Sequence, residues 1–389
     1  MQRKRLRFYI LFFLAGVCLI GNSGCKKFAK TEELMKRMEV TTQKMEELTT
    51  RMEAATQKLE HLPQKTSVEK TIITASMEQE MLTGKNVLWC STLQLAWNEL
   101  ITLAGGPIQM TDAPPLVALL NRQTANKADL DEGSYIAIAG LAGEDLRAKI
   151  EHAQQTFKDQ KLAEDLGAPP PGSVVAYAYL LKTLPFEWAF KRFEIPFPFG
   201  ATDVVYFGIQ QYLPGDPNMD AVASQVVILD YRSANDFMLE LKTRSAQDRL
   251  ILAKISPQAT LTDTISQVFT RVAQTHPGPL GKSETLAIPV IDIDRFQAYA
   301  ELAGQNIIAS NPAVSGAQFS RVAQRIRFKL DETGAILESE AIFTSSLSPR
   351  QFMFDQPFLV VLLRQGAERP YFAAWIANSE VLVPFDASK

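Results

Sequence analysis

The residues of this chain that could support catalysis or bind a metal are few and far apart. Its histidines are His61, His152 and His276, and no cluster of cysteines or carboxylates accompanies any of them. Because a protein metal site needs several such ligands close together, we expect no metal. Asp292 and Asp294 alternate along a predicted strand, which favours a solvated face over a pair of catalytic carboxylates. We therefore predict no cofactor and no enzymatic activity.

Motifs of other function classes are also missing from the sequence. The glycine pair in Gly105-Gly106-Pro107 lacks the spacing and the following lysine of a phosphate loop. No Gly-x-Ser-x-Gly nucleophile elbow occurs. The net charge is -3 and the body has no basic cluster, which argues against nucleic acid as a partner. Cys90 follows Val87-Leu88-Trp89, and we interpret it as a buried thiol that acts as a small hydrophobic side chain.

The sequence suggests a chemical role for one cysteine, Cys25, which lies near the N-terminus. Residues 1–7 are basic and residues 8–21 are almost wholly apolar. An apolar run of this length is shorter than the roughly 20 residues that span a bilayer, and it fits a signal peptide over residues 1–24. Ser23-Gly24-Cys25 resembles a bacterial lipobox, which implies lipid attachment at Cys25. The alternative is a plain secretory signal in which Cys25 is incidental.

Lipid on Cys25 would make the chain a membrane protein by anchoring alone. Several acyl chains would hold it stably, because each buried methylene contributes about 0.8 kcal/mol. Lys26 stands where an aspartate would suggest retention in the inner membrane. The resemblance therefore implies an outer-membrane lipoprotein of the cell envelope, facing the periplasm or the surface, with residues 25–33 as its tether.

A seven-residue repeat follows the tether. One seam of the repeat contains methionines and a leucine, the second contains Leu34, Leu48 and Leu62 with Thr41 and Ala55 between them, and Glu and Lys or Arg flank both. This pattern predicts a coiled-coil stalk over residues 34–62, ended by Pro63, and a homo-oligomer formed through it. The alternative is a single amphipathic helix. Residues 63–84 are expected to be a linker. The first seam consists of Met38, Met45, Met52 and Leu59.

Residues 85–389 predict one α+β domain with several antiparallel strand pairs. Ser91-Thr92 is expected to cap a first helix that ends at Gly105. The four tryptophans, Trp89, Trp97, Trp188 and Trp375, are interpreted as core residues. Further helices are predicted at 144–157, 261–274 and 295–303. Strands are predicted at 134–140, 174–181, 203–209, 225–231, 237–243, 285–293, 325–330, 358–364 and 371–376.

The C-terminal part carries a recognisable order of segments. Asp331-Glu332-Thr333-Gly334 is followed by about fifteen residues and then by Phe352-Met353-Phe354-Asp355-Gln356-Pro357-Phe358. This order resembles the end of a serpin: an acidic hinge that ends in glycine, an exposed reactive loop, and a closing pair of strands. Phe352, Asp355, Pro357 and Phe358 match the C-terminal signature of the family.

Four earlier segments occur in serpin order, so the resemblance covers about 300 residues. It implies a serpin-like body with a large mixed central sheet, smaller antiparallel sheets and packed helices, preceded by a coiled-coil helix. Tyr177 stands where the family has Asn in its long central strand, and Asp230 stands where it has Pro. The segments are Asn86–Trp89, Val175–Lys182 with Trp188 and Phe193, Val226–Tyr231 with Phe237–Leu241, and Leu286–Pro289 with Phe296.

The resemblance also assigns roles to the loop. In an inhibitory serpin a protease cuts the loop, which then inserts as a new strand and traps the enzyme. The scissile bond would be Leu347-Ser348, and a leucine there would attract chymotrypsin- or subtilisin-like enzymes. Residues 345–349 can equally be an ordinary exposed turn. The reactive-loop residues implied are Gly334, Ala335, Leu337, Leu347 and Ser348.

The side chains after Gly334 argue against inhibition. Alternate residues from Ala335 to Phe343 can be buried, as an inserted strand requires. Ile336, Leu337 and Phe343 are bulky, however, where the inhibitory pattern has small residues. Each misfit costs about 1–3 kcal/mol and would slow insertion. We therefore expect a non-inhibitory protein that acts by protein binding. The alternative is a suicide-type inhibitor of a serine or cysteine protease, cleaved near Leu347.

Overall fold

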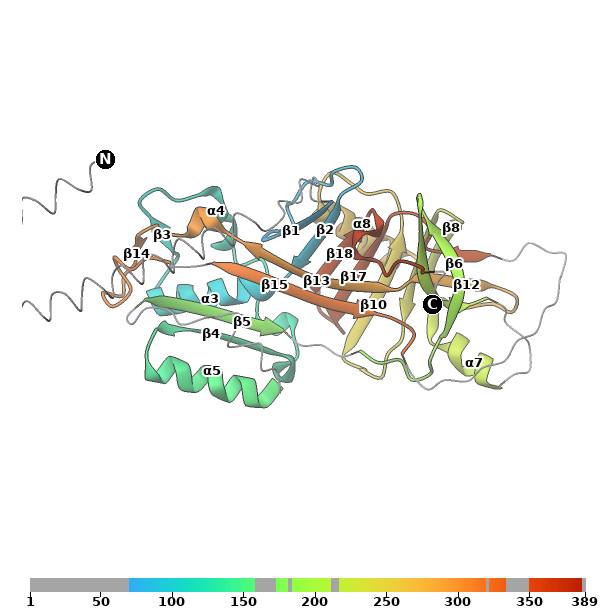
Figure 1. Ribbon diagram of the computed structural model, residues 1–389, viewed down its shortest axis with the longest axis horizontal. Helices are drawn as coiled ribbons and strands as arrows, with labels where there is room; N and C mark the ends of the chain where they lie inside the picture. The colour runs from blue at the N-terminus through green and yellow to red at the C-terminus, as the bar shows by residue number, and fades with distance from the viewer. Residues whose placement is uncertain are drawn as a thin grey trace, which may run out of the picture. The chain divides into compact units, whose positions relative to one another are not determined.

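The computed structural model describes residues 70–157, 173–180, 184–210, 217–319, 322–333 and 350–386, all within the unit Glu69–Lys389 (Figure 1). The predicted signal peptide, the tether with Cys25 and the heptad segment 34–62 lie outside the described residues. Among the helices that are described, none has the length and apolar character needed to cross a bilayer.

The largest sheet has eight strands and is mixed, because β1 runs parallel to β2 while the other neighbours are antiparallel. Its strands β17 and β18 are buried almost throughout, as expected for continuous apolar runs that are covered on both faces. In spatial order the strands are β1 (Thr71–Thr74), β2 (Asn86–Cys90), β18 (Pro370–Ile376), β17 (Phe358–Arg364), β10 (Asp248–Lys254), β9 (Asp236–Leu241), β8 (Val226–Ser233) and β11 (Gly278–Pro279).

The second sheet has four strands, in the order β16 (Gln351–Met353), β12 (Thr285–Pro289), β7 (Thr202–Ile209) and β6 (Lys191–Phe199). Gly208 permits the close approach of β7 and β12. Its φ is +151°, and a Cβ there would lie 2.0 Å from the carbonyl oxygen of Leu286. Three further pairs are β4 (Tyr135–Leu141) with β5 (Val174–Leu180), β13 (Ile291–Ala298) with β15 (Ala323–Leu330), and β3 (Gln109–Met110) with β14 (Ile307–Ile308).

Helices cover these sheets. Helix α8 (Leu261–Gln274) packs Leu261, Ile265 and Val268 onto one face of the large sheet. Helix α3 (Thr92–Ala104) contacts β4, β5 and β15, and α5 (Glu144–Phe157) lies along β4 (Figure 1). The other helices within the described residues are α4 (Pro115–Leu120) and α7 (Pro217–Ser224), with short 3-10 turns η1 (Lys127–Asp129), η2 (Glu132–Ser134), η3 (Ala300–Leu302) and η4 (Ser379–Val381).

The predicted α+β class is confirmed, with a large mixed sheet, smaller sheets and packed helices. Helix α3 ends at Gly105 with a φ of +77°, as predicted, because glycine adopts the left-handed cap at little cost. Ser91 occupies the N-cap position as predicted, but its side chain makes no cap hydrogen bond, and its Oγ is buried without a partner in the described part of the chain.

Two predictions in residues 285–303 were wrong. The single strand 285–293 is divided at Val290, which bonds to Val205 and Val383 and so turns the chain from β12 into β13. The helix at 295–303 is instead the second half of β13 followed by η3. Buried Ile291 and Ile293 alternate with exposed Asp292 and Asp294, a two-residue period that extends the strand.

Other differences concern exposure and pairing. Strand β5, expected to be a buried central strand of the large sheet, pairs with β4 alone among the described strands and is mostly half-buried. Trp188 is 48% exposed, whereas the other three tryptophans are core residues as predicted. Strand β10, at the middle of the large sheet, was not predicted, and β1 forms within the segment expected to be a linker.

Candidate functional site

The candidate site is the connection between β15 and β16, whose two ends lie in different sheets. Strand β15 belongs to the β13–β15 pair, and β16 is an edge strand of the four-stranded sheet. The residues implied as reactive loop lie in the segment 334–349, outside the described residues, so their roles stay predictions. Those residues are Gly334, Ala335, Leu337, Leu347 and Ser348.

Charged contacts hold the chain just before this segment. The Asp331 carboxylate pairs with the Lys329 ammonium at 2.6 Å and accepts a 2.9 Å hydrogen bond from the backbone N–H of Thr333. Glu332 pairs with Arg192 of β6, and the Arg192 nitrogen lies 3.2 and 3.1 Å from the two carboxylate oxygens. Burial by itself raises the pKa of Asp331. The hydrogen bonds from Lys329 and Thr333 together lower the pKa by more than burial raises it, so the pKa lies below its usual value.

A second set of contacts holds the chain just after the segment. The guanidinium of Arg350 donates to the carboxylate of Glu284, a residue only 7% exposed. The backbone N–H of Gly281 also donates to Glu284, at 2.5 Å. The Arg350 guanidinium lies 5.3 Å from the ring centre of Tyr231 and 5.6 Å from that of Phe352, within cation–π range. The chain is thus fixed at residue 350 by charge and by aromatic contact.

Lys254 anchors the chain further on, at Met353 and Asp355. Its side chain is only 2% exposed, and its ammonium donates to the carbonyl oxygens of Ala234 at 3.0 Å and Met353 at 2.9 Å. The third donor reaches the carboxylate of Asp355 at 2.5 Å. All three ammonium protons are therefore used, which a buried cation requires. Asp355, chosen from the sequence for its place in the C-terminal signature, is the charged partner of this lysine.

The aromatic residues of the signature lie in the core. Phe352 is fully buried and meets the rings of Phe237 and Tyr231 edge-on, with centroid distances of 5.2 and 5.3 Å. Phe354 lies 5.0 Å from both Phe237 and Phe358. Such edge-to-face and tilted pairs add about 0.5–1.5 kcal/mol each beyond the area that they bury. Pro357 is exposed and directly precedes β17, where its missing N–H leaves no ladder bond unmade.

A third feature is the contact of β15 with α3. The β4–β5 and β13–β15 pairs both contact α3, but no strand pairing joins β5 to β15 among the described residues. The buried amide of Gln324 connects β15 to the start of α3, donating to the Cys90 carbonyl at 3.0 Å and to Thr92 Oγ1 at 2.9 Å. Cys90 is buried here as predicted, and burial raises the pKa of its thiol.

The other sequence candidates fall elsewhere. Asp292 and Asp294 are exposed on β13, and Asp294 pairs with Arg325 through two contacts of 2.7 Å. Among the described residues, no group of three His, Cys, Asp or Glu side chains is placed to hold a metal. Lys254 and Glu284 were not predicted, because each is a single charged residue beside an apolar run and nothing in the sequence signals its distant partner.

Among known proteins, solved structures are similar to this chain. No protein-family model and no curated protein matches the sequence. Among solved structures the chain is similar to serpins. The first is Serpin48, described as a highly specific serpin of the insect Tenebrio molitor (TM-score 0.45, 14% identity, 75% of this chain and 92% of that chain). Others are thyroxine-binding globulin in complex with thyroxine (0.44, 13%, 76% and 93%) and mouse protein-Z dependent protease inhibitor (0.46, 14%, 75% and 91%).

Replacing Lys254 by methionine should destabilise the body strongly. The change keeps the apolar stem but leaves the carbonyls of Ala234 and Met353 without their donor, at a cost of about 2–4 kcal/mol in the free energy of unfolding. Arg244→Met is the matched control, because Arg244 and Glu187 form an exposed pair and its loss costs under about 1 kcal/mol. Denaturant unfolding measures both, and equal losses would contradict a central role for Lys254.

Replacing Asp331 by asparagine should change how the free energy of unfolding depends on pH in the acid range. Since the folded pKa of Asp331 lies below its unfolded value of about 3.9, ionised Asp331 stabilises the folded state above about pH 4. That contribution is lost as the pH falls through the folded pKa. Asp331→Asn should therefore be less stable than the native chain at pH 7, and the difference should shrink below about pH 4. Asp292→Asn, the same change at an exposed position, is the control in melts at several pH values.

Proposed function

We propose that this protein is a serpin-type, membrane-anchored protein of the cell envelope that acts by binding another protein through residues 334–349. The observation that carries the proposal is the fixing of both ends of this segment, by Glu332 and Arg192 on one side and by Arg350 and Glu284 on the other. A connection between two fixed ends has fewer conformations to lose than a free tail, so binding a partner costs less entropy.

The proposal makes the protein non-inhibitory. Trapping a protease requires the cut loop to insert before the acyl-enzyme hydrolyses. Ile336, Leu337 and Phe343 are large, and the segment is about one residue shorter than the inhibitory pattern. Each oversized side chain costs about 1–3 kcal/mol in a packed sheet. Slow insertion then gives cleavage without capture.

The anchoring part of the proposal rests on the sequence alone. Lipid on Cys25 would hold the chain at the outer membrane, and residues 34–62 would act as an oligomerising stalk. A homo-oligomer presents several copies of the segment 334–349 on one assembly. Such multivalency raises the effective affinity for a clustered partner without any new contact.

A second candidate function is suicide inhibition of a serine or cysteine protease, and one observation favours it. Strands β5 and β15 both lie on α3 without pairing to each other among the described residues. The segment that begins at Ala335 follows β15 by a few residues and has a two-residue period. An added strand between β5 and β15 would give both edges hydrogen-bond partners.

Incubation of the protein with chymotrypsin or subtilisin separates the two functions. We expect cleavage at Leu347-Ser348 without a covalent complex that survives denaturation. The triple variant Ile336→Thr, Leu337→Ala and Phe343→Ala should form a detectable covalent complex with the protease, because it lacks the large side chains that slow insertion. Leu347→Asp is the control that abolishes cleavage. A complex with the native chain at high yield would instead establish inhibition, and cleavage elsewhere would exclude Leu347 as the bait.

The anchor is tested separately by Cys25→Ser. In a bacterial host that processes lipoproteins, the native chain should take up labelled palmitate and enter the membrane fraction. The variant should lose the label and become extractable without detergent, since acyl chains supply the membrane affinity. Cys18→Ser is the matched control and should behave as the native chain. Label that persists in Cys25→Ser would contradict lipid attachment at this residue.

A further inference from the structure

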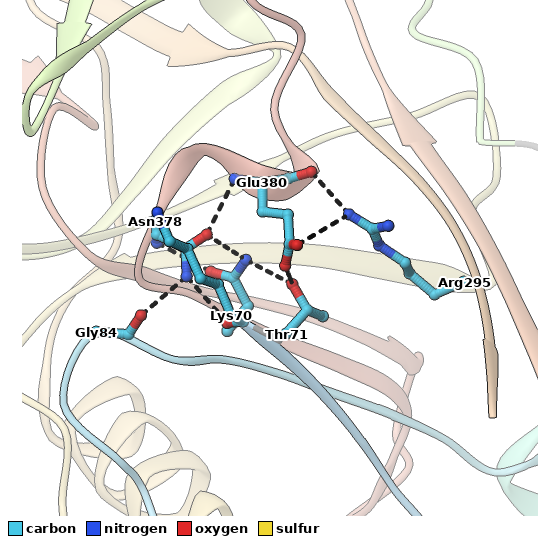
Figure 2. Close-up of polar contacts among 7 residues, drawn as sticks. Lys70, Thr71, Gly84, Arg295, Asn378 and Glu380 are labelled. Carbon is cyan, nitrogen blue, oxygen red and sulfur yellow. Dashed lines mark hydrogen bonds and ion pairs between the residues drawn. The ribbon is translucent and has the colours of Figure 1, made fainter. Parts of the chain in front are cut away.

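A network of hydrogen bonds from two asparagine side chains holds the start of the described chain, at residues 70 and 71 (Figure 2). Asn86, at the start of β2, is completely buried. Its carbonyl oxygen accepts from the backbone N–H groups of Ala377 at 2.7 Å and Asn378 at 2.9 Å. Its amide nitrogen donates to Thr71 Oγ1 and Asn378 Oδ1, both at 3.0 Å. Both donors and both acceptor sites of this amide are therefore used.

Asn378 extends this network to the backbone just before β1 and just before β2. Its amide nitrogen donates to the carbonyl oxygens of Lys70 at 3.0 Å and Gly84 at 2.9 Å. The backbone N–H of Asn86 donates to the same Lys70 carbonyl at 2.8 Å. Lys70 is thus held by two donors, one from β2 and one from the turn that follows β18 (Figure 2).

Glu380 joins a third strand to the same corner. Its carboxylate accepts from Thr71 Oγ1 at 2.6 Å. The guanidinium of Arg295, on β13, donates to the Glu380 carbonyl at 2.9 Å and lies 3.9 Å from its carboxylate. Strand β13 is the partner of β15, which leads into the segment 334–349. The entry of the chain and the strand pair that leads to the candidate site therefore meet at one turn.

These hydrogen bonds lie at the place where tension on the N-terminal part of the chain would act on the body. Strand β1 has four residues and, among the described strands, lies at the edge of the large sheet and pairs in parallel with β2 alone. So short a pairing is weak by itself. Tension on the chain before Lys70 pulls first on the bonds of Lys70 and Thr71, because peeling starts at the end where the force is applied. Those are the residues that the network holds.

We infer that this network is a load-bearing clamp, which passes tension from the N-terminal part of the chain to the turn after β18 and so keeps β1 from peeling. We call it the entry clamp. Its biological use rests on the proposed tether, but its existence does not. The entry clamp consists of Lys70, Thr71, Gly84, Asn86, Arg295, Asn378 and Glu380.

Asn378→Asp tests the entry clamp with a small change. The variant keeps an oxygen that can accept from Asn86 and Glu380, but it loses the donors to Lys70 and Gly84. Asn306→Asp is the matched control, since Asn306 is exposed and its oxygen accepts from Gln318 outside the clamp. In the full chain, we expect the amides of residues 71–74 to exchange with solvent about tenfold faster in Asn378→Asp, while those at the centre of β17 stay unchanged.

Pulling single molecules by handles at the two chain ends tests the load itself. The force of the first rupture should fall in Asn378→Asp and stay at the native value in Asn306→Asp. Thr71→Val, which removes one hydroxyl at constant shape, should show a smaller change in the same direction. Unchanged exchange and rupture force in both clamp variants would overturn the inference, as would equally faster exchange across β17. Handles replace the lipid, so failure of lipid attachment at Cys25 leaves this result independent.

Discussion

The arrangement of the candidate site depends on the hydrogen bonds that the buried ammonium of Lys254 donates. It lies at the end of β10 in the middle of the large sheet, and its donors reach the β8–β9 turn, the end of β16 and Asp355. Removing a cation from water is costly unless every proton finds a partner, so these three acceptors are held at fixed positions around it. The chain that leaves the segment 334–349 is therefore tied to the large sheet before it enters β17.

The two ends of that segment are each held by charged contacts with the body. Arg350 is fixed through Glu284 and through the rings of Tyr231 and Phe352, which pack on the large sheet. Residues 331–332 are fixed through Lys329 and Arg192, on β15 and β6. A shift of the β13–β15 pair relative to the four-stranded sheet would change the span between the ends. The span between the two ends is thus set by sheet packing.

The sequence predicted those elements whose burial is visible in one stretch of residues. Strands β17 and β18 are long apolar runs, and α5 and α8 keep a helical period, so local pattern was sufficient. Strand β10 was not predicted because charges flank its short apolar centre, and the second half of β13 was mistaken for a helix because its residues are mixed. The contacts of Lys254 with Asp355 and of Asn86 with Asn378 span 101 and 292 residues, and no local pattern encodes them.

Strands β5 and β15 do not pair with each other among the described residues, and this poses the energetic question for insertion of a strand between them. Ten residues from Ala335 to Thr344 could add hydrogen bonds worth about 0.5–1.5 kcal/mol each, roughly 5–15 kcal/mol in all. Three oversized side chains at about 1–3 kcal/mol each would remove roughly 3–9 kcal/mol of that gain. Gln324 also ties β15 to α3, so separating the pairs further breaks buried bonds. Insertion of this segment would therefore release less free energy than insertion of a strand with small side chains.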